Sequence, residues 1–303
     1  MQIGIIGLGK MGGAIARRLC ESDIHVVGLD IEPSAADALK PVPGFEAAYS
    51  LGALLLALPA PRMVWCMLPS GEATQQTLDD LLHKLSAGDV AIDGSNSFYK
   101  DSMARAGRFE EHGIAFIDAG VSGGLGGREN GFGIMMGGSE DTVKMIERPL
   151  NALAPHPQQW LHCGPSGAGH FVKMIHNGIE YGMMQAYAEG LALLQGKREF
   201  DLDLPAITSM WEHGSVIRSW LLELITVFLR HDSKLSHVAP VVADSGEGRW
   251  AAIESIEQGI PAPVITTALM QRFSSQGHDD FAARLLAMMR KSFGGHGIET
   301  KKP

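Results

Sequence analysis

The strongest constraint on the fold is an alternation of short β-branched apolar runs with amphipathic helical patterns, which extends from Met1 to about Leu161. Such alternation is typical of a doubly wound parallel sheet, because parallel strands need crossover helices to connect them. The strand-like runs are Ile3–Ile6, Val26–Leu29, Met63–Leu68, Val90–Ile92 and Ile114–Ile117, and the longer helical patterns between them are Met11–Cys20, Glu72–Leu85 and Tyr99–Glu111.

After Gly167 the strand-like runs disappear, and long helical patterns replace them. The turn-rich stretch Cys163–Gly167 stands immediately before the first of these helices. The sequence therefore predicts an α/β domain over residues 1–165 and an all-helical domain over residues 166–303. The helical patterns are Gly169–Gln195, Leu204–His213, Val216–Arg230, Arg249–Gln258, Val264–Phe273 and Phe281–Arg290.

A glycine-rich turn, Gly7–Gly12, follows the first strand directly and opens a helix. In this setting glycines let the backbone approach a pyrophosphate at a helix N-terminus. Asp30 ends the next strand, at roughly the 20-residue offset of the acid that binds the adenosine ribose. The alternative for Asp30 is a turn or capping residue before Pro33. Both context tests favour a Rossmann-type dinucleotide site formed by Gly7, Leu8, Gly9, Lys10, Met11, Gly12 and Asp30.

The acid at Asp30 also bears on the choice of cofactor. A carboxylate beside the ribose accepts hydrogen bonds from both hydroxyls, but it repels a 2′-phosphate. No arginine follows at Ile31 or Glu32 to neutralise such a phosphate. NAD is therefore expected rather than NADP.

Three further strand ends carry small, polar or glycine-rich loops, namely Met67–Gly71, Asp93–Ser97 and Val121–Gly124. Any one of them could be ordinary turn chemistry. Together with the glycine-rich turn, they indicate a shared crevice at the carboxyl ends of the strands. The expected contacts to the cofactor are Met67, Leu68, Pro69 and Asn96.

One helical pattern in the second half has an unusual polar face. Lys173, His176, Asn177 and Glu180 stand at i, i+3, i+4 and i+7 and so share one side of the helix. Considered alone, Lys173 would be interpreted as a solvent-exposed helix residue and His176 as a hydrogen-bonded histidine in the core. Together they suggest catalysis, because a desolvated lysine can act as a general base toward an alcohol and a buried glutamic acid can serve as the acid.

Composition limits the partners and the setting. A chain of 303 residues with 45% hydrophobic and 19% charged residues can bury a full core. Its net charge of −9 argues against nucleic acid or an anionic membrane as partner. Three cysteines without CxxC spacing suggest neither a disulfide framework nor a zinc site. This cysteine usage makes a reducing cytoplasm the expected setting. The run Leu51–Leu58 is too short to span a bilayer, and no basic leader precedes the first apolar run, so neither export nor membrane insertion is expected.

Several cations could form a local anion site in this acidic chain. Arg249, Arg272 and Lys173 are candidates, together with the tail Arg290–His296. Arginine forks suit phosphate and carboxylate groups. The alternative for the tail is a fraying chain end.

The motifs resemble the decarboxylating 6-phosphogluconate dehydrogenases in sequence and order, over nearly the whole chain. The matching segments are Gly7–Gly12, Ile92–Ser97, Val121–Gly124 and Gly169–Tyr181, of which the last is highly specific. The resemblance implies oxidative decarboxylation of 6-phospho-D-gluconate to D-ribulose 5-phosphate and carbon dioxide. It assigns Lys173 to take the proton from the carbon-3 hydroxyl and Glu180 to deliver a proton to carbon 1 of the enediol.

The same resemblance implies the remaining contacts. Tyr181 and Arg272 lie toward the phosphate, and the tail reaches a neighbouring subunit's site, which implies a homo-oligomer, either a dimer or a tetramer. The matching tail residues are Arg290, Phe293, Gly294 and His296, and the residues that hold the sugar acid are Asn96, Ser122, Gly123, Gly124, His176 and Asn177.

The chain departs from the common form of that family in three ways. It is much shorter and carries one helical unit. The stretch Asp244–Trp250 is contracted and has no lysine to bind phosphate, so that role is not transferred, and whether Arg249 compensates is left open. The Asp30 argument favours NAD, whereas NADP is usual.

Two other readings compete with this one. The related β-hydroxyacid dehydrogenases, such as 3-hydroxyisobutyrate dehydrogenase, share the two-domain plan and a catalytic lysine but do not decarboxylate. A nucleotide-sensing protein without catalysis is the other. The pairing of Lys173 with Glu180 and the added cations favour the phosphosugar acid.

Overall fold

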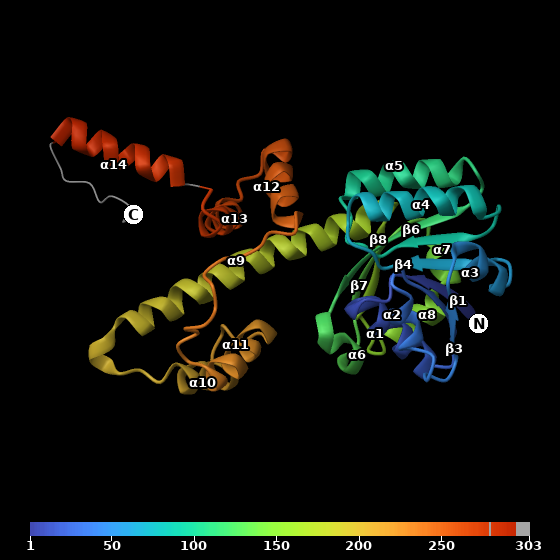
Figure 1. The fold of residues 1–303 in the computed structure, drawn as a ribbon, viewed down its shortest axis with the longest axis horizontal. Helices are drawn as coiled ribbons and strands as arrows, with labels where there is room; N and C mark the ends of the chain where they lie inside the picture. Colours follow the sequence, from blue (N-terminus) through green and yellow to red (C-terminus); the bar gives the residue numbers. More distant parts are fainter. Residues whose placement is uncertain (279, 295–303) are drawn as a thin grey trace. The chain divides into compact units, whose positions relative to one another are not determined.

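The computed structural model describes residues 1–278 and 280–294. The chain divides into two compact units, of which the first is Met1–His176 and the second begins at Asn177. All strands of the described residues lie in the first unit and form one sheet of eight strands (Figure 1). The second unit is all-helical over its described residues. This confirms the predicted α/β and helical fold classes.

The order of strands in the sheet is β3-β2-β1-β4-β5-β6-β7-β8. Every neighbouring pair is parallel except β6 and β7, which run antiparallel. The predicted doubly wound parallel sheet is therefore confirmed, and the one antiparallel pair is a feature that the sequence did not indicate. The strands are β1 Gln2–Ile6, β2 His25–Leu29, β3 Phe45–Ala48, β4 Met63–Cys66, β5 Val90–Asp93, β6 Ala115–Ser122, β7 Gly133–Gly137 and β8 Trp160–Gly164.

Helices cover both faces of the sheet, as the alternation of side chains along its strands requires. In β1, Ile3 and Ile5 enter one hydrophobic cluster and Ile6 enters the other. On the first face lie α1 (Lys10–Glu21) and α8 (Glu147–Leu153), and on the second lie α3 (Leu51–Ala57), α4 (Glu72–Lys84) and α5 (Tyr99–Glu110) (Figure 1). The shorter helices of this unit are α2 Pro33–Asp37, a 3₁₀ turn at Gly124–Gly126, α6 Gly127–Asn130 and α7 Glu140–Met145.

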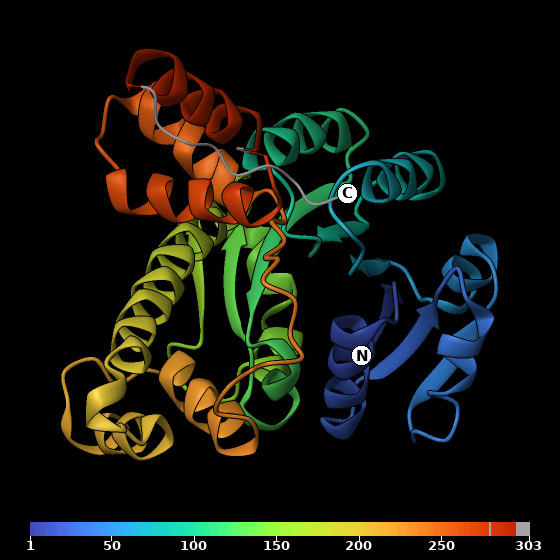
Figure 2. The same cartoon turned by 60° about the vertical axis from the view of Figure 1, so that its left-hand side comes forward.

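One long helix, α9 (Ala168–Gly196), begins in the first unit and continues into the second. In the second unit α10 and α11 pack against each other, as Figure 2 shows, and α12 packs with α13. None of the helices in the described ranges has both the length and the apolarity needed to cross a bilayer. These helices are α10 Leu204–Gly214, α11 Trp220–His231, α12 Glu247–Gln258, α13 Pro263–Ser275 and α14 Asp280–Gly294, with a 3₁₀ turn at Arg198–Phe200.

A small core holds α12 and α13 against the middle of α9. Its buried members are Tyr181, Ala252, Ala268 and Leu269. A Cβ atom at Gly248 would lie 2.5 Å from the Tyr181 ring, so glycine is required for α12 to approach this closely. This packing fixes the position of Tyr181 within the second unit.

Candidate active site

The glycine-rich turn leaves open space where a dinucleotide could approach. A Cβ at Gly7, whose φ is +91°, would lie 2.4 Å from the Met67 carbonyl oxygen, and one at Gly12 would lie 1.9 Å from the Gly7 carbonyl oxygen. These two glycines are required by packing. A Cβ at Gly9 would meet nothing within 4 Å. Gly9 caps α1, so the open space lies at a helix N-terminus, the position that suits a pyrophosphate.

Asp30 faces this turn from the end of β2. Its Oδ2 accepts a hydrogen bond from the Leu8 N–H at 2.6 Å, and its Oδ1 accepts one from the Glu32 N–H at 2.9 Å. The residue thus forms a local turn, as the alternative reading expected, and is also tied to the glycine-rich turn. Lys10 and Met11 follow in the first turn of α1. The residues present therefore fit a pyridine nucleotide.

The three loops expected to form a crevice follow β4, β5 and β6, which are neighbours in the sheet. Asn96 adopts a φ of +50°, a backbone conformation that asparagine tolerates better than most residues. Its side-chain oxygen accepts a hydrogen bond from the Val121 N–H at 3.2 Å. Asn96 thus joins the loop after β5 to the end of β6. In the other two loops, Met67, Leu68, Ser122 and Gly123 are half-buried, whereas Pro69 and Gly124 are exposed.

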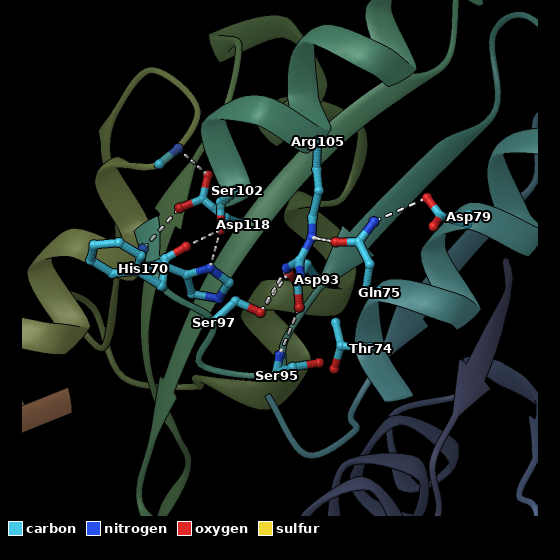
Figure 3. Close-up of polar contacts among 12 residues, drawn as sticks. Thr74, Gln75, Asp79, Asp93, Ser95, Ser97, Ser102, Arg105, Asp118 and His170 are labelled. Atoms are coloured by element: carbon cyan, nitrogen blue, oxygen red, sulfur yellow. Dashed lines mark hydrogen bonds and ion pairs between the residues drawn. The ribbon is translucent and has the colours of Figure 1, made fainter. Parts of the chain in front are cut away.

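A buried ion pair that the sequence did not reveal shapes the Asn96 loop (Figure 3). Asp93 is fully buried, and its Oδ2 accepts hydrogen bonds from the Arg105 guanidinium at 2.8 Å and the Ser97 hydroxyl at 2.9 Å. Its Oδ1 accepts one from the Ser95 N–H at 3.0 Å. Arg105 also donates to Gln75 Oε1 at 2.9 Å. The signal available in the sequence was an arginine within the amphipathic pattern Tyr99–Glu111, with no indication that it faces inward.

A second buried carboxylate, also without a role in the sequence reasoning, lies at the start of α9 (Figure 3). Asp118 is fully buried in β6 and accepts hydrogen bonds from the backbone N–H groups of Gly167, at 2.6 Å, and His170, at 2.8 Å. The His170 ring is itself buried, with Nδ1 2.7 Å from the Ser102 hydroxyl oxygen. These contacts fasten the beginning of α9 to the sheet.

The polar face predicted from the sequence lies on α9, which is one continuous helix. Lys173 is 5% exposed, whereas His176, Asn177 and Glu180 are half-buried. A Cβ added to Gly120 of β6 would lie 2.4 Å from the Lys173 Cβ. The lysine stem therefore passes directly over the strand that leads to Ser122.

A cluster of polar and aromatic groups surrounds Tyr181 in the second unit. The Arg272 guanidinium carbon lies 3.5 Å from the centroid of the Tyr181 ring, and its Nη1 donates to the Ala243 carbonyl at 2.7 Å. The Tyr181 hydroxyl lies 3.4 Å from the Ser245 hydroxyl. Arg249 pairs with Asp244 and stacks on a phenylalanine, Phe273, at 4.5 Å. The Asp244 carboxylate already pairs with Arg249, so an anion that binds Arg249 would have to compete with this ion pair.

Two tail residues were also predicted to belong to the site. Arg290 lies in α14 and is exposed, while His296 lies outside the described residues. Within residues 1–278 and 280–294, no group of three or more His, Cys, Asp or Glu side chains is arranged to hold a metal ion. Cys66 ends β4 near these loops, and burial raises the pKa of its thiol, so it stays protonated near neutral pH.

The fold and the glycine-rich turn define a dinucleotide-binding oxidoreductase with a helical second domain. The family model for the NAD binding domain of 6-phosphogluconate dehydrogenase matches residues 2–164, and that for the C-terminal domain of 6-phosphogluconate dehydrogenase matches residues 169–302. The chain belongs to the 6-phosphogluconate dehydrogenase family, oxidoreductases that act on a CH–OH group. This confirms the resemblance seen in the sequence.

The similarity to individual relatives also bears on length. The NAD(+)-dependent, decarboxylating 6-phosphogluconate dehydrogenase of Haloferax volcanii is 41% identical over 302 residues, which cover 99% of both chains. A decarboxylating 6-phosphogluconate dehydrogenase of Bacillus licheniformis is 32% identical over 295 residues, but the match covers only 63% of its length. The short form is thus shared with the Haloferax protein.

Among solved structures, the 6-phosphogluconate dehydrogenase of Plasmodium falciparum has a similar fold. Its TM-score is 0.83 at 24% identity, and the match covers 100% of this chain and 67% of that one. At this identity the likeness describes the fold alone.

A side chain at position 9 should fill the open space at the start of α1 and so weaken dinucleotide binding without unfolding the protein. Gly9→Ala adds a methyl group that meets no protein atom within 4 Å but occupies the space at the start of α1. We expect the Kd for NADH to rise by about tenfold or more, which is ~1.4 kcal/mol, with an unchanged melting temperature. Fluorescence titration of NADH measures the Kd, and an unchanged Kd would show that the nucleotide does not approach here.

Breaking the buried ion pair should cost far more than breaking an exposed one. Arg105→Met leaves the Asp93 carboxylate buried without its cation, which should lower the free energy of unfolding by about 3–5 kcal/mol. Arg108→Met is the matched control, because its 2.6 Å pair with Asp79 is 45% and 40% exposed and should be worth less than about 1 kcal/mol. Urea unfolding measures both, and equal losses would contradict the expected difference.

Proposed function

We propose that the protein oxidises and decarboxylates 6-phospho-D-gluconate, releasing D-ribulose 5-phosphate and carbon dioxide, with NAD as the electron acceptor. The observation that carries the proposal is the buried Lys173, seated on Gly120 of the strand that leads to the Ser122–Gly124 loop. His176, Asn177 and Glu180 continue its polar face along α9. The similarity to the NAD(+)-dependent, decarboxylating 6-phosphogluconate dehydrogenase of Haloferax volcanii supports both the reaction and the cofactor.

In the first step, the amine of Lys173 accepts the proton of the carbon-3 hydroxyl. Lys173 is 5% exposed, and a lysine amine in its neutral form can act as a general base toward an alcohol. The glycine-rich turn and Asp30 would hold NAD, which would supply the acceptor for the hydride that leaves carbon 3. Asn96, Ser122, Gly123 and Gly124 hold the sugar acid in this orientation.

The oxidised product is a β-keto acid, which loses carbon dioxide readily because the ketone accepts the electron pair of the broken bond. Lys173, now protonated, donates a hydrogen bond to the developing enolate oxygen. Glu180 then delivers a proton to carbon 1 of the enediol. His176 and Asn177, on the same helical face, hydrogen-bond the substrate through both steps.

For the phosphate, we propose Tyr181 and Arg272. Arg272 stacks on the Tyr181 ring, which holds its guanidinium in a fixed plane, and a planar fork matches phosphate oxygens. Arg249 contributes less, since Asp244 already pairs with it. Arg290 and His296 complete the phosphate site of a neighbouring copy in a homo-oligomer.

The preference for NAD follows from Asp30. Its carboxylate is held between the Leu8 and Glu32 N–H groups, so it cannot swing away from the ribose without losing both hydrogen bonds. A 2′-phosphate would meet this fixed negative charge.

The first experiment measures initial rates of cofactor reduction with 6-phosphogluconate and either NAD or NADP, together with released carbon dioxide. We expect reduction of NAD, matched by equimolar carbon dioxide, and at least about a tenfold lower kcat/KM with NADP, which corresponds to ~1.4 kcal/mol. Asp30→Ser should reduce the ratio of kcat/KM with NAD to kcat/KM with NADP, because it removes the negative charge beside the ribose. 3-Hydroxyisobutyrate serves as the control substrate, and turnover of that compound alone would replace the proposal with a non-decarboxylating dehydrogenase.

The catalytic base is tested by Lys173→Met, which keeps much of the side chain's length. Loss of the base should lower kcat by at least about 10²–10⁴-fold, while the Kd for NADH stays within about twofold, because Lys173 is not expected to hold the nucleotide. Lys84→Met, at the exposed end of α4, is the matched control and should be fully active. Turnover retained in Lys173→Met would remove the base from the mechanism.

A further inference from the structure

Helix α9 begins without a capping side chain of its own. The residue before it is Gly167, whose φ of +95° and missing side chain leave the first N–H groups of the helix to other partners. Asp118 supplies that partner from β6, since its two carboxylate oxygens accept from the N–H groups of Gly167 and His170. A buried anion therefore lies at the positive end of a helix of 29 residues.

Between this carboxylate and Lys173, the helix lies directly on backbone. A Cβ at Gly169 would fall 2.5 Å from the carbonyl oxygens of Asp118 and Met135, and a Cβ at Gly120 would fall 2.4 Å from the Lys173 Cβ. At Gly169 the helix backbone lies against the backbone of β6 and β7, and at Gly120 the strand backbone lies against the first carbons of the Lys173 side chain. A shift of the helix start would therefore move the Lys173 side chain relative to β6.

We propose that Asp118 is a positioning residue for the chemical step. It holds the first turn of α9 so that Lys173, one turn further on, keeps its register over Gly120 and the Ser122 loop. This inference rests on the proposed function of Lys173 as the base. Asparagine at position 118 would present an amide N–H₂ toward one of the two backbone donors, so one charge-assisted hydrogen bond would be replaced by a repulsion.

The chain offers a matched control in a second buried carboxylate. Asp89 is 1% exposed and accepts hydrogen bonds from the backbone N–H groups of Arg62, at 2.7 Å, and Ser86, at 3.0 Å, and it also pairs with the Arg62 guanidinium at 3.2 Å. It precedes β5 and so lies at the amino end of a strand, whereas the candidate crevice lies at the carboxyl ends. Asp89→Asn therefore removes a similar buried acceptor without touching α9.

The test compares wild type, Asp118→Asn and Asp89→Asn by kcat, KM for 6-phosphogluconate, Kd for NADH and urea midpoint. For Asp118→Asn we expect kcat to fall by about ten- to a hundredfold, the loss typical of a misplaced reacting group, while KM and Kd change by less than about threefold. Asp89→Asn should lower the urea midpoint but leave kcat within about twofold of wild type. A kcat for Asp118→Asn within twofold of wild type, or equal kcat losses in both variants, would overturn the inference.

Asp118→Ser provides a second variant in case Asp118→Asn does not fold, because serine is shorter and places no amide N–H₂ against the backbone donors. The same fall in kcat is expected for it. If neither variant folds, Asp118 is a determinant of the fold as a whole and the inference fails. The wild-type rate distinguishes failure of the positioning role from failure of the proposed function. If wild type does not turn over 6-phosphogluconate, the proposed function is wrong. If wild type is active, Lys173→Met is inactive and Asp118→Asn is fully active, only the positioning role is wrong.

Discussion

The burial of two carboxylates behind the carboxyl ends of β5 and β6 governs the rest of the first unit. Asp93 and Asp118 each end or interrupt an apolar strand, and each must find donors because a buried unpaired charge is very costly. Asp93 accepts hydrogen bonds from Arg105 and from the backbone of its own loop, and these contacts stabilise the loop that carries Asn96. Asp118 finds the start of α9. The polar loops and the helix are thus held by the same requirement that buried charge be satisfied.

Much of the fold followed from local pattern. The runs that became β1, β2, β4, β5 and β6 contain β-branched residues, and helical patterns were predicted for the segments that form α9 to α14. The strands β3, β7 and β8 were not predicted, because Phe45–Ala48 and Trp160–Gly164 contain no β-branched residue and Gly133–Gly137 carries glycine at both ends. The reversal of β7 depends on the path of the chain around α6, which periodicity does not report.

The candidate site divides in the same way. Gly9, Asp30, Asn96 and Lys173 could be selected from the sequence because each sits in a motif whose spacing has a physical meaning. Asp118 could not, since its partners lie 49 and 52 residues away and no local pattern connects them. The engagement of Arg249 by Asp244 was likewise unseen, although the two are five residues apart, because an irregular loop and a helix start separate them.

The boundary between the two compact units falls inside α9, between His176 and Asn177. The helix keeps a rise of about 1.5 Å per residue, so the Cα atoms of Lys173 and Glu180 are spaced by roughly 10 Å along its axis. Within a continuous helix this spacing is set by the backbone hydrogen bonds of α9 alone. The distance between the proposed proton acceptor and the proposed proton donor is therefore a property of one helix, although the two residues belong to different compact units.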